Sequence, residues 1–220
     1  MPVLLVCATE LERAPLADLL GPEILVRTLV CGVGLVDAAI GLADHLRSGP
    51  DPGLVINFGV GGAYCGAARL LDLCVATSEH LGDAAICYDD RMEPFAADAF
   101  PFFSDCRLPQ APAVRVRDLL AAAGFATVAG PFVTVNCVSG SRRRGDLLRD
   151  RFGAVCENME GAALARVCQR RDIPFVEIRC CSNLVEDRNR SGWLLEEATR
   201  RCAEAVAVLL SGEKTASPRS

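Results

Sequence analysis

Short, almost continuous apolar stretches alternate along the chain with longer stretches in which apolar residues recur with a helical period. Apolar runs of about four to eight residues rich in Val, Ile and Leu are typical of buried strands, and the helical period is typical of helices that bury one face. The pattern predicts strands at Val3–Ala8, Ile24–Val30, Leu54–Phe58, Leu73–Thr77, Thr127–Val133, Ala154–Glu157 and Phe175–Cys181. It predicts helices at Arg13–Leu20, Leu35–Arg47, Ala113–Ala123, Arg142–Arg151, Glu160–Arg171 and Ser191–Leu210.

This alternation predicts an α/β fold, in which a three-layer sandwich has a twisted, mostly parallel central sheet with helices on both faces. We expect one domain over residues 1–210 and a disordered polar tail over residues 211–220. The least regular part is Gly82–Pro112, which is long and rich in phenylalanine and proline. Excursions of this kind often form lids or subunit contacts.

The composition supports a globular domain that binds neither nucleic acid nor membrane. Of the 220 residues, 51% are hydrophobic and 5% aromatic, which suits a well-filled core. The net charge of -5 and a pI near 5.2 argue against nucleic acid or an acidic membrane surface as a partner. The uncharged run Gly53–Ala68 is too short and too rich in glycine to span a membrane, and the start lacks the basic region of a secretory signal. We therefore expect a cytoplasmic protein.

Cysteine is abundant, with 12 residues, but its spacing does not indicate a redox or metal site. There is no Cys-x-x-Cys motif, and the chain has only two histidines. The adjacent Cys180 and Cys181 point to opposite faces of a predicted strand, so a bridge between them would be strained. We expect reduced thiols that behave as small hydrophobes, no metal and no cofactor; those in apolar runs are Cys7, Cys31, Cys74, Cys156 and Cys180.

Polar residues and glycines follow most of the predicted strands. In open α/β sheets ligands bind beyond the carboxyl ends of the strands. The segments at these ends are Thr9–Glu12, Gly32–Gly34, Gly59–Gly62, Thr134–Gly140, Asn158–Gly161 and Ser182–Asn183. Their convergence at one edge predicts a binding or catalytic site.

The two glycine-rich segments, "CGVGLVD" and "FGVGGAY", leave two interpretations open. Neither completes Gly-x-Gly-x-x-Gly, and there is no Walker A motif, so a dinucleotide site has little support. The glycines either form tight turns that let helices approach the sheet, or bring the backbone close to a ligand.

Two glutamates near predicted helix starts have both a structural and a catalytic interpretation. Thr9–Glu12 matches a capping box, in which the glutamate bonds back to the helix start. Proline belongs in the first turn of a helix, so Pro15 moves the expected start to Leu11–Ala14 and leaves Glu12 freer to face a cleft. Glu160 either complements the helix dipole or accepts hydrogen bonds from two neighbouring hydroxyls, such as those of a ribose.

Two further polar features follow predicted strands. Asn183 comes directly after the last strand, where it either caps the turn or contacts a ligand. Arg142, Arg143 and Arg144 form a basic cluster; a solvated helix face is the favoured interpretation, and a site for a substrate carboxylate is the alternative.

The segments "ATELE", "CGVGLVDAA", "INFGVGG", "ENMEGAALARVC" and "IRCCSNLVED" occur in the order seen in the nucleoside phosphorylase/nucleosidase superfamily. Over about Val3–Leu210 the chain resembles the nucleosidase branch, which includes methylthioadenosine/S-adenosylhomocysteine nucleosidase. The segments "TSEHLGDAA", "TVNCVSGS" and "CSNLVEDR" make it most similar to the futalosine hydrolase family. The resemblance implies hydrolysis of futalosine to hypoxanthine and dehypoxanthine futalosine, on the futalosine route to menaquinone. An adenine-releasing nucleosidase and a purine nucleoside phosphorylase are the alternatives.

The same resemblance implies roles for individual residues and a homodimer or larger homo-oligomer. The position of Glu12 orients and deprotonates the attacking water, and the position of Glu160 holds the ribose hydroxyls. The residues implied to bind the rest of a purine nucleoside are Val60, Gly61, Gly62, Val138, Ser139 and Met159.

The chain departs from the adenine-specific members at two positions. Those members have aspartate where this chain has Asn183, and serine near the water where it has Val60. The NH2 group of asparagine donates to N7 and O6 of hypoxanthine, whereas an ionised carboxylate would repel both. Asparagine cannot give up a proton, so we expect it to assist the leaving base by hydrogen bonding alone. Asn183 therefore favours a 6-oxopurine as the leaving group.

Overall fold

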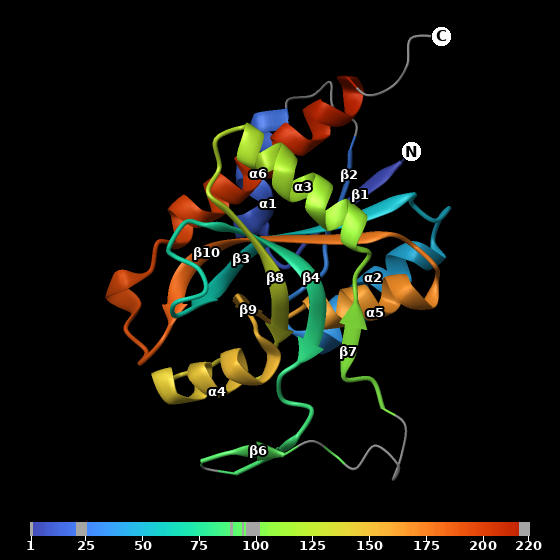
Figure 1. Ribbon diagram of the computed structural model, residues 1–220. Helices are drawn as coiled ribbons and strands as arrows, with labels where there is room; N and C mark the ends of the chain where they lie inside the picture. The colour runs from blue at the N-terminus through green and yellow to red at the C-terminus, as the bar shows by residue number, and fades with distance from the viewer. Residues whose placement is uncertain (1, 21–25, 89, 94, 96–101, 216–220) are drawn as a thin grey trace.

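The computed structural model describes residues 2–20, 26–88, 90–93, 95 and 102–215, and the statements below concern these residues. Helices and strands alternate along most of the chain (Figure 1). The strands are β1 (Val3–Cys7), β2 (Arg27–Val30), β3 (Leu54–Tyr64), β4 (Leu73–Leu81), β5 (Ile86–Cys87), β6 (Met92–Glu93), β7 (Asp105–Arg107), β8 (Thr127–Thr134), β9 (Cys156–Asn158) and β10 (Phe175–Val185). The helices are α1 (Glu10–Leu20), α2 (Leu35–Arg47), α3 (Gln110–Ala122), α4 (Arg142–Phe152), α5 (Gly161–Arg170) and α6 (Leu195–Thr215), with a 3₁₀ turn at Arg190–Gly192.

The main sheet is partly closed into a barrel. Strands β10, β4, β8, β9 and β3 are hydrogen-bonded in this order, and β3 also pairs with β10, which closes a ring. Strands β1 and β2 extend the sheet from β3. Three pairs are antiparallel, namely β10 with β4, β3 with β9 and β4 with β7. The predicted α/β fold is confirmed, but the sheet is mixed and partly closed rather than the mostly parallel centre of a three-layer sandwich.

The ring closes because three strands run beyond their predicted ends: β3 to Tyr64, β4 to Leu81 and β10 to Val185. The "GVGG" segment therefore lies inside β3 and forms no tight turn. A Cβ on Gly61 would lie 2.9 Å from the carbonyl oxygen of Glu157, so the absent side chain lets β3 pass close to β9. The other glycine segment does turn tightly, with φ of +92° and +88° at Gly32 and Gly34.

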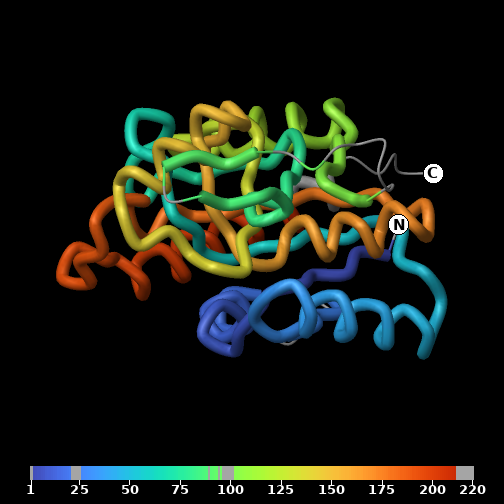
Figure 2. Tube along the Cα trace, turned by 90° about the horizontal axis from the view of Figure 1, so that it is seen from below, coloured from blue at the N-terminus to red at the C-terminus, as the bar shows by residue number. Residues whose placement is uncertain are grey.

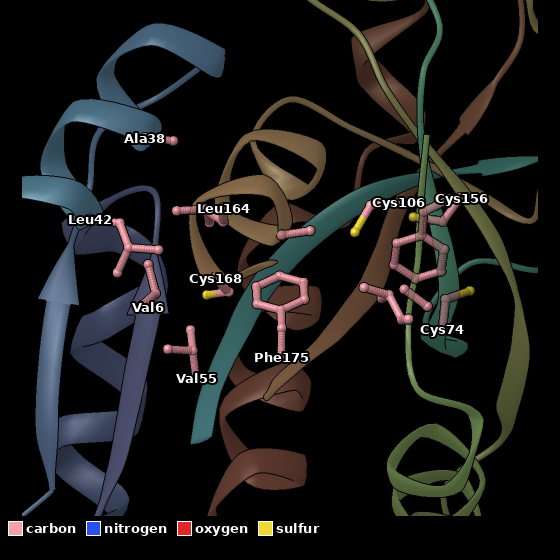
Figure 3. Packing of buried hydrophobic residues seen from close by; sticks show 14 of the residues in the cluster. Val6, Ala38, Leu42, Val55, Cys74, Cys106, Cys156, Leu164, Cys168 and Phe175 are labelled. Atoms are coloured by element: carbon pink, nitrogen blue, oxygen red, sulfur yellow. The ribbon is translucent and has the colours of Figure 1, made fainter. Parts of the chain in front are cut away.

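Helices cover both faces of the sheet. Helices α1, α3 and α6 pack on one apolar face, and α2 and α5 lie side by side on the other (Figures 1 and 2). Successive residues of β1 alternate between the two faces, as strand geometry requires. Figure 3 shows the α2 and α5 side, where the packed residues include Val6, Ala38, Leu42, Val55, Leu164, Cys168 and Phe175.

All 12 cysteines are free thiols, and only Cys87 and Cys137 are exposed. Cys180 and Cys181 belong to cores on opposite sides of the sheet, as the strand assignment predicts. No group of histidine, cysteine or acidic side chains in the described part of the chain is arranged to hold a metal ion.

The two irregular regions of the sequence are only partly described. The excursion after β4 contains the short strands β5, β6 and β7, of which β7 pairs with β4; residues 89, 94 and 96–101 lie outside the described residues. Helix α6 continues to Thr215, into the expected tail, and residues 216–220 also lie outside the described residues. Among the described helices, none is long and apolar enough to cross a membrane.

Candidate active site

A cavity of about 540 Å³ opens where the ends of β1, β3, β9 and β10 meet. Its wall includes α1 at the first turn, the loop before α4 and the segment that joins β10 to α6. The structure brings all nine candidate residues to this cavity: Glu12, Val60, Gly61, Gly62, Val138, Ser139, Met159, Glu160 and Asn183. Their common location is an observation, whereas the role of each residue remains a prediction.

Glu12 is buried at the cavity wall and its carboxylate is held by four hydrogen-bond donors. Oε2 accepts the backbone N–H groups of Ala8 and Thr9 at 3.0 Å each and the Thr9 hydroxyl at 3.1 Å. Oε1 accepts the Val60 N–H at 3.0 Å. These donors hold the Glu12 side chain in place, and Oε1 retains room to accept a further hydrogen bond.

The two interpretations of Glu12 are not exclusive. Helix α1 begins at Glu10 and not at Leu11–Ala14, so the expectation drawn from Pro15 is wrong. Thr9 accepts the Glu12 N–H at 3.3 Å while Glu12 accepts the Thr9 N–H, which completes the capping box. The cap thus uses one carboxylate oxygen and leaves the other facing Val60 and the cavity.

Glu160 precedes α5 and is also buried. Its Oε1 accepts the Gly34 N–H at 3.0 Å. Gly34 makes this contact from the turn before α2, with a positive φ that glycine adopts without strain. Its own N–H donates to Asn158 Oδ1 at 3.0 Å. Each Glu160 oxygen has one protein partner and keeps acceptor capacity for a ligand hydroxyl.

Arg179, for which the sequence alone predicts no role, joins these two carboxylates. Its guanidinium donates to Glu160 Oε2 at 3.2 Å, to the Val60 carbonyl at 3.2 Å and to Glu177 at 2.9 Å, and it lies 3.9 Å from Glu12 Oε1. Arg179 is 1% exposed. Burial opposes its charge, but Glu177, Glu160 and Glu12 raise the pKa of Arg179 well above its ordinary value. A positive charge is therefore fixed between the two candidate catalytic carboxylates.

Asn183 lies within β10 and not after it, so the turn-cap interpretation is wrong. The register of β10 shifts between Cys181 and Asn183, which turns the amide towards the cavity. Its Oδ1 accepts the Ser182 hydroxyl at 3.0 Å, and its Nδ2 donates to the Leu184 carbonyl at 3.2 Å. The second Nδ2 hydrogen is left for a ligand acceptor.

Ser139 and Glu157 form a hydrogen-bonded polar part of the cavity wall. Glu157 accepts the Ser139 N–H at 2.9 Å, the Ser139 hydroxyl at 2.6 Å and the Tyr64 hydroxyl at 3.1 Å. Burial, followed by the Glu157 charge, raises the pKa of Tyr64 well above its ordinary value. Since its N–H and its hydroxyl hydrogen are already bound, Ser139 can offer a ligand acceptors only, namely its carbonyl and hydroxyl oxygens.

Arginines differ in their access to the cavity. Arg142 is paired with Asp146, and Arg144 is tied to Asp83 and the Cys137 carbonyl, outside the cavity wall. Arg188 lines the cavity, and its guanidinium lies over the Trp193 ring at 4.9 Å from the centroid.

The chain is similar in sequence and in fold to known proteins. The chain belongs to the Phosphorylase superfamily, whose family model matches residues 21–212. It is 31% identical to futalosine hydrolase of Streptomyces coelicolor over 95% of each chain. It is 29% identical to 5'-methylthioadenosine/S-adenosylhomocysteine nucleosidase of Geobacillus kaustophilus over 83% of this chain and 78% of that one.

Among solved structures, a futalosine hydrolase mutant of Helicobacter pylori superimposes with a TM-score of 0.84. The match covers 96% of this chain and 99% of that chain, at 17% sequence identity, so it shows the shared fold. The expected membership of the nucleoside phosphorylase/nucleosidase superfamily is confirmed by the family model and by the futalosine hydrolase relative.

Proposed function

We propose that this chain hydrolyses the N-glycosidic bond of futalosine and releases hypoxanthine and dehypoxanthine futalosine. The observation that carries the proposal is the meeting of Glu12, Glu160 and Asn183 in one cavity. Relatives named futalosine hydrolase, 31% identical over almost the whole chain, support the choice of substrate. Accordingly, the enzyme is a purine nucleosidase that acts without a cofactor.

Glu12 is the general base of the proposed reaction. A water bound at Glu12 Oε1 attacks the anomeric carbon, its proton passes to Glu12, and the electrons of the broken C–N bond move onto the purine. The purine leaves as an anion and takes up a proton from water, and Glu12 returns its own proton to water. The Val60 side chain has no group to hold this water. Its N–H, however, fixes Glu12 Oε1 at 3.0 Å, so the main chain at this position still orients the base.

Glu160 holds the ribose. Two neighbouring hydroxyls donate to its free acceptor sites, and the carboxylate stabilises the positive charge that develops on the ribosyl ring as the bond breaks. Arg179 fixes Glu160 Oε2 at 3.2 Å and prevents the carboxylates of Glu12 and Glu160 from repelling each other out of position. Met159, beside Glu160 in the cavity wall, packs on a flat face of the nucleoside.

Asn183 selects the base. Its Nδ2 faces a cavity wall formed by Gly62, whose missing side chain leaves room for a purine edge; a Cβ there would lie 3.3 Å from Nδ2. The free Nδ2 hydrogen of the amide donates to O6 of hypoxanthine, whereas adenine presents a 6-amino group at that place, which would leave this donor unpaired. A phosphorylase is disfavoured because water activation is the task that Glu12 suits.

Arg188 binds the carboxylate of the substrate's 5′ tail. Of Arg142, Arg143, Arg144 and Arg188, only Arg188 lines the cavity, where its guanidinium stacks on the ring of Trp193, another residue of the wall. Its guanidinium makes no ion pair within the described part of the chain, so it is available to an anion.

The proposed compartment, pathway, oligomeric state and partners rest on the family resemblance and on the composition. The single domain over residues 1–210 acts in the cytoplasm on the futalosine route to menaquinone, as a homodimer or larger homo-oligomer. Its partner is a small purine nucleoside, and neither nucleic acid nor a membrane takes part.

The test is turnover of futalosine in phosphate-free H₂¹⁸O by wild type and by Glu12→Gln. The wild type places ¹⁸O on the anomeric carbon of the product. Glu12→Gln loses turnover, while ligand binding by calorimetry is kept, because the amide preserves shape but cannot take the proton. Glu10→Gln is the matched control, since Glu10 is exposed on the same helical turn and pairs with Arg13. Near-normal turnover by Glu12→Gln would reduce Glu12 to a helix cap.

A further inference from the structure

Two carboxyl groups lie behind the cavity and are not part of its wall. Glu79 on β4 and Glu177 on β10 are both 0% exposed. Glu177 Oε1 accepts the Arg179 Nε–H at 2.9 Å. Glu79 accepts the Thr134 hydroxyl at 2.6 Å and the Asn158 Nδ2–H at 2.9 Å, and neither donor carries a charge.

The two carboxyl groups meet at the start of α5. A Cβ placed on Gly161 would overlap both Glu79 Oε1 and Glu177 Oε2, so the two oxygens reach towards the same point in space. Glu177 Oε2 is buried and receives no hydrogen bond from any donor among the described residues. A buried acceptor without a donor, next to a second carboxylate, would be strongly destabilising.

One proton removes this conflict. If Glu79 Oε1 carries it, Glu79 donates to Glu177 Oε2, and every buried oxygen of the pair has a partner. Glu177 keeps its negative charge because it has the cation Arg179, whereas Glu79 has no ion pair among the described residues. Burial, followed by the Glu177 charge, raises the pKa of Glu79 well above its ordinary value, in agreement with this assignment.

We propose that Glu79 and Glu177 share one proton, carry a single negative charge between them, and act as positioning residues for Arg179. Glu177 anchors Nε of Arg179, which leaves the other two nitrogens to hold Glu160 and the Val60 carbonyl. Asn158 extends the same network, since it donates to Glu79 and accepts the N–H groups of Glu160 and Gly161 at 3.0 and 2.7 Å. The protonated acid thus fixes both the side chain and the backbone around Glu160.

The first test measures charge and does not depend on any substrate. Native electrophoretic mobility at pH 7.5 compares wild type with Glu79→Gln, with the double variant Glu79→Gln/Glu177→Gln, and with Glu197→Gln as an exposed control on α6. We expect Glu79→Gln to migrate as wild type, and the double variant and the control each to lose one negative charge. A shift of one full charge in Glu79→Gln would show that Glu79 is ionised and would overturn the proposal.

A second measurement needs no variant at Glu79. The infrared carbonyl band of a protonated carboxylic acid persists in folded wild type at pH 7.5, where exposed carboxyl groups are ionised. Its absence would also refute the shared proton, even if the variants proved too unstable to purify.

The kinetic test rests on the proposed function. Glu79→Gln still donates to Glu177, although it loses the acceptor for Asn158, so we expect kcat within about threefold of wild type. Glu177→Gln removes the charge partner of Arg179, and we expect kcat to fall by about tenfold or more, since hydrogen bonds to charged groups are the stronger ones. Equal losses in the two variants would contradict the positioning role, whereas lack of activity in wild type would refute only the proposed function.

Discussion

Gly59 on β3 offers a test of the claim that the position of Glu12 determines activity. An added Cβ at Gly59 would overlap Glu12 Oε1 and would lie 2.8 Å from Glu12 Cδ and 3.0 Å from Arg179 Nη1. Nonbonded carbon atoms pack at about 3.5–4.0 Å, so Gly59→Ala must push the carboxylate back by roughly 1 Å. That movement breaks the bond between Glu12 Oε1 and the Val60 N–H, now 3.0 Å long.

The expected effect follows from this displacement. A misplacement of about 1 Å lowers turnover by about 100-fold, whereas an extra methyl in a packed interior destabilises the fold by about 1–3 kcal/mol. Initial rates with futalosine give kcat and KM, and urea unfolding gives the free energy of unfolding. We expect kcat to fall about 100-fold in Gly59→Ala while the protein remains folded.

Gly140 provides the matched control, because it lies in the loop beside Ser139 and a Cβ there would meet no atom within 4 Å. Gly140→Ala should keep wild-type kcat within about twofold, as an unhindered methyl changes little. If folded Gly59→Ala also kept kcat within threefold of wild type, the geometry of Glu12 would not be what sets the rate.

Three further predictions follow from the site and the core. Asn183→Asp should lose at least about tenfold in kcat/KM on the 6-oxopurine, because a carboxylate repels N7 and O6; an unchanged value would remove Asn183 from base recognition. The pKa of Glu79 is raised in the folded state, so above about pH 4.3 the folded protein holds one more proton than the unfolded chain. The free energy of unfolding of wild type should therefore fall, relative to that of Glu79→Gln, by about 1.4 kcal/mol per pH unit. Urea unfolding from pH 5 to 7 measures this difference, and a constant difference would contradict the prediction. A thiol reagent should modify only Cys87 and Cys137 in the folded protein and all 12 cysteines after denaturation; early reaction of more thiols would show that the core opens.

The amphipathic helices were predictable from the sequence because their signal is local. Helix α2 matches its predicted bounds at Leu35 and Arg47, where apolar spacing and the Gly34 turn agree. The ends of β3 and β10 were not predictable in the same way. Glycines at Gly59–Gly62 and the polar pair Ser182–Asn183 ordinarily end a strand, but ring closure supplies their pairing partners from distant strands.

The candidate residues at strand ends could be predicted because the carboxyl ends of parallel strands lie at the same edge of the sheet. The role of Arg179 was not predictable from position, because Arg179 lies inside an apolar strand and not at its end. Its charge was the one unusual feature there. A charged residue in a buried strand needs a partner, and Glu177, two positions earlier on the same face, is the signal that could have identified the pair. Glu79 carries no comparable local signal, because its partner lies on another strand.

The central claim is tested most directly by one comparison of substrates. Purified enzyme is incubated without phosphate with futalosine, inosine and methylthioadenosine, and the released bases are separated and quantified. We predict release of hypoxanthine from futalosine at a much higher kcat/KM than for either other nucleoside. Release of adenine from methylthioadenosine with futalosine left intact would contradict the account.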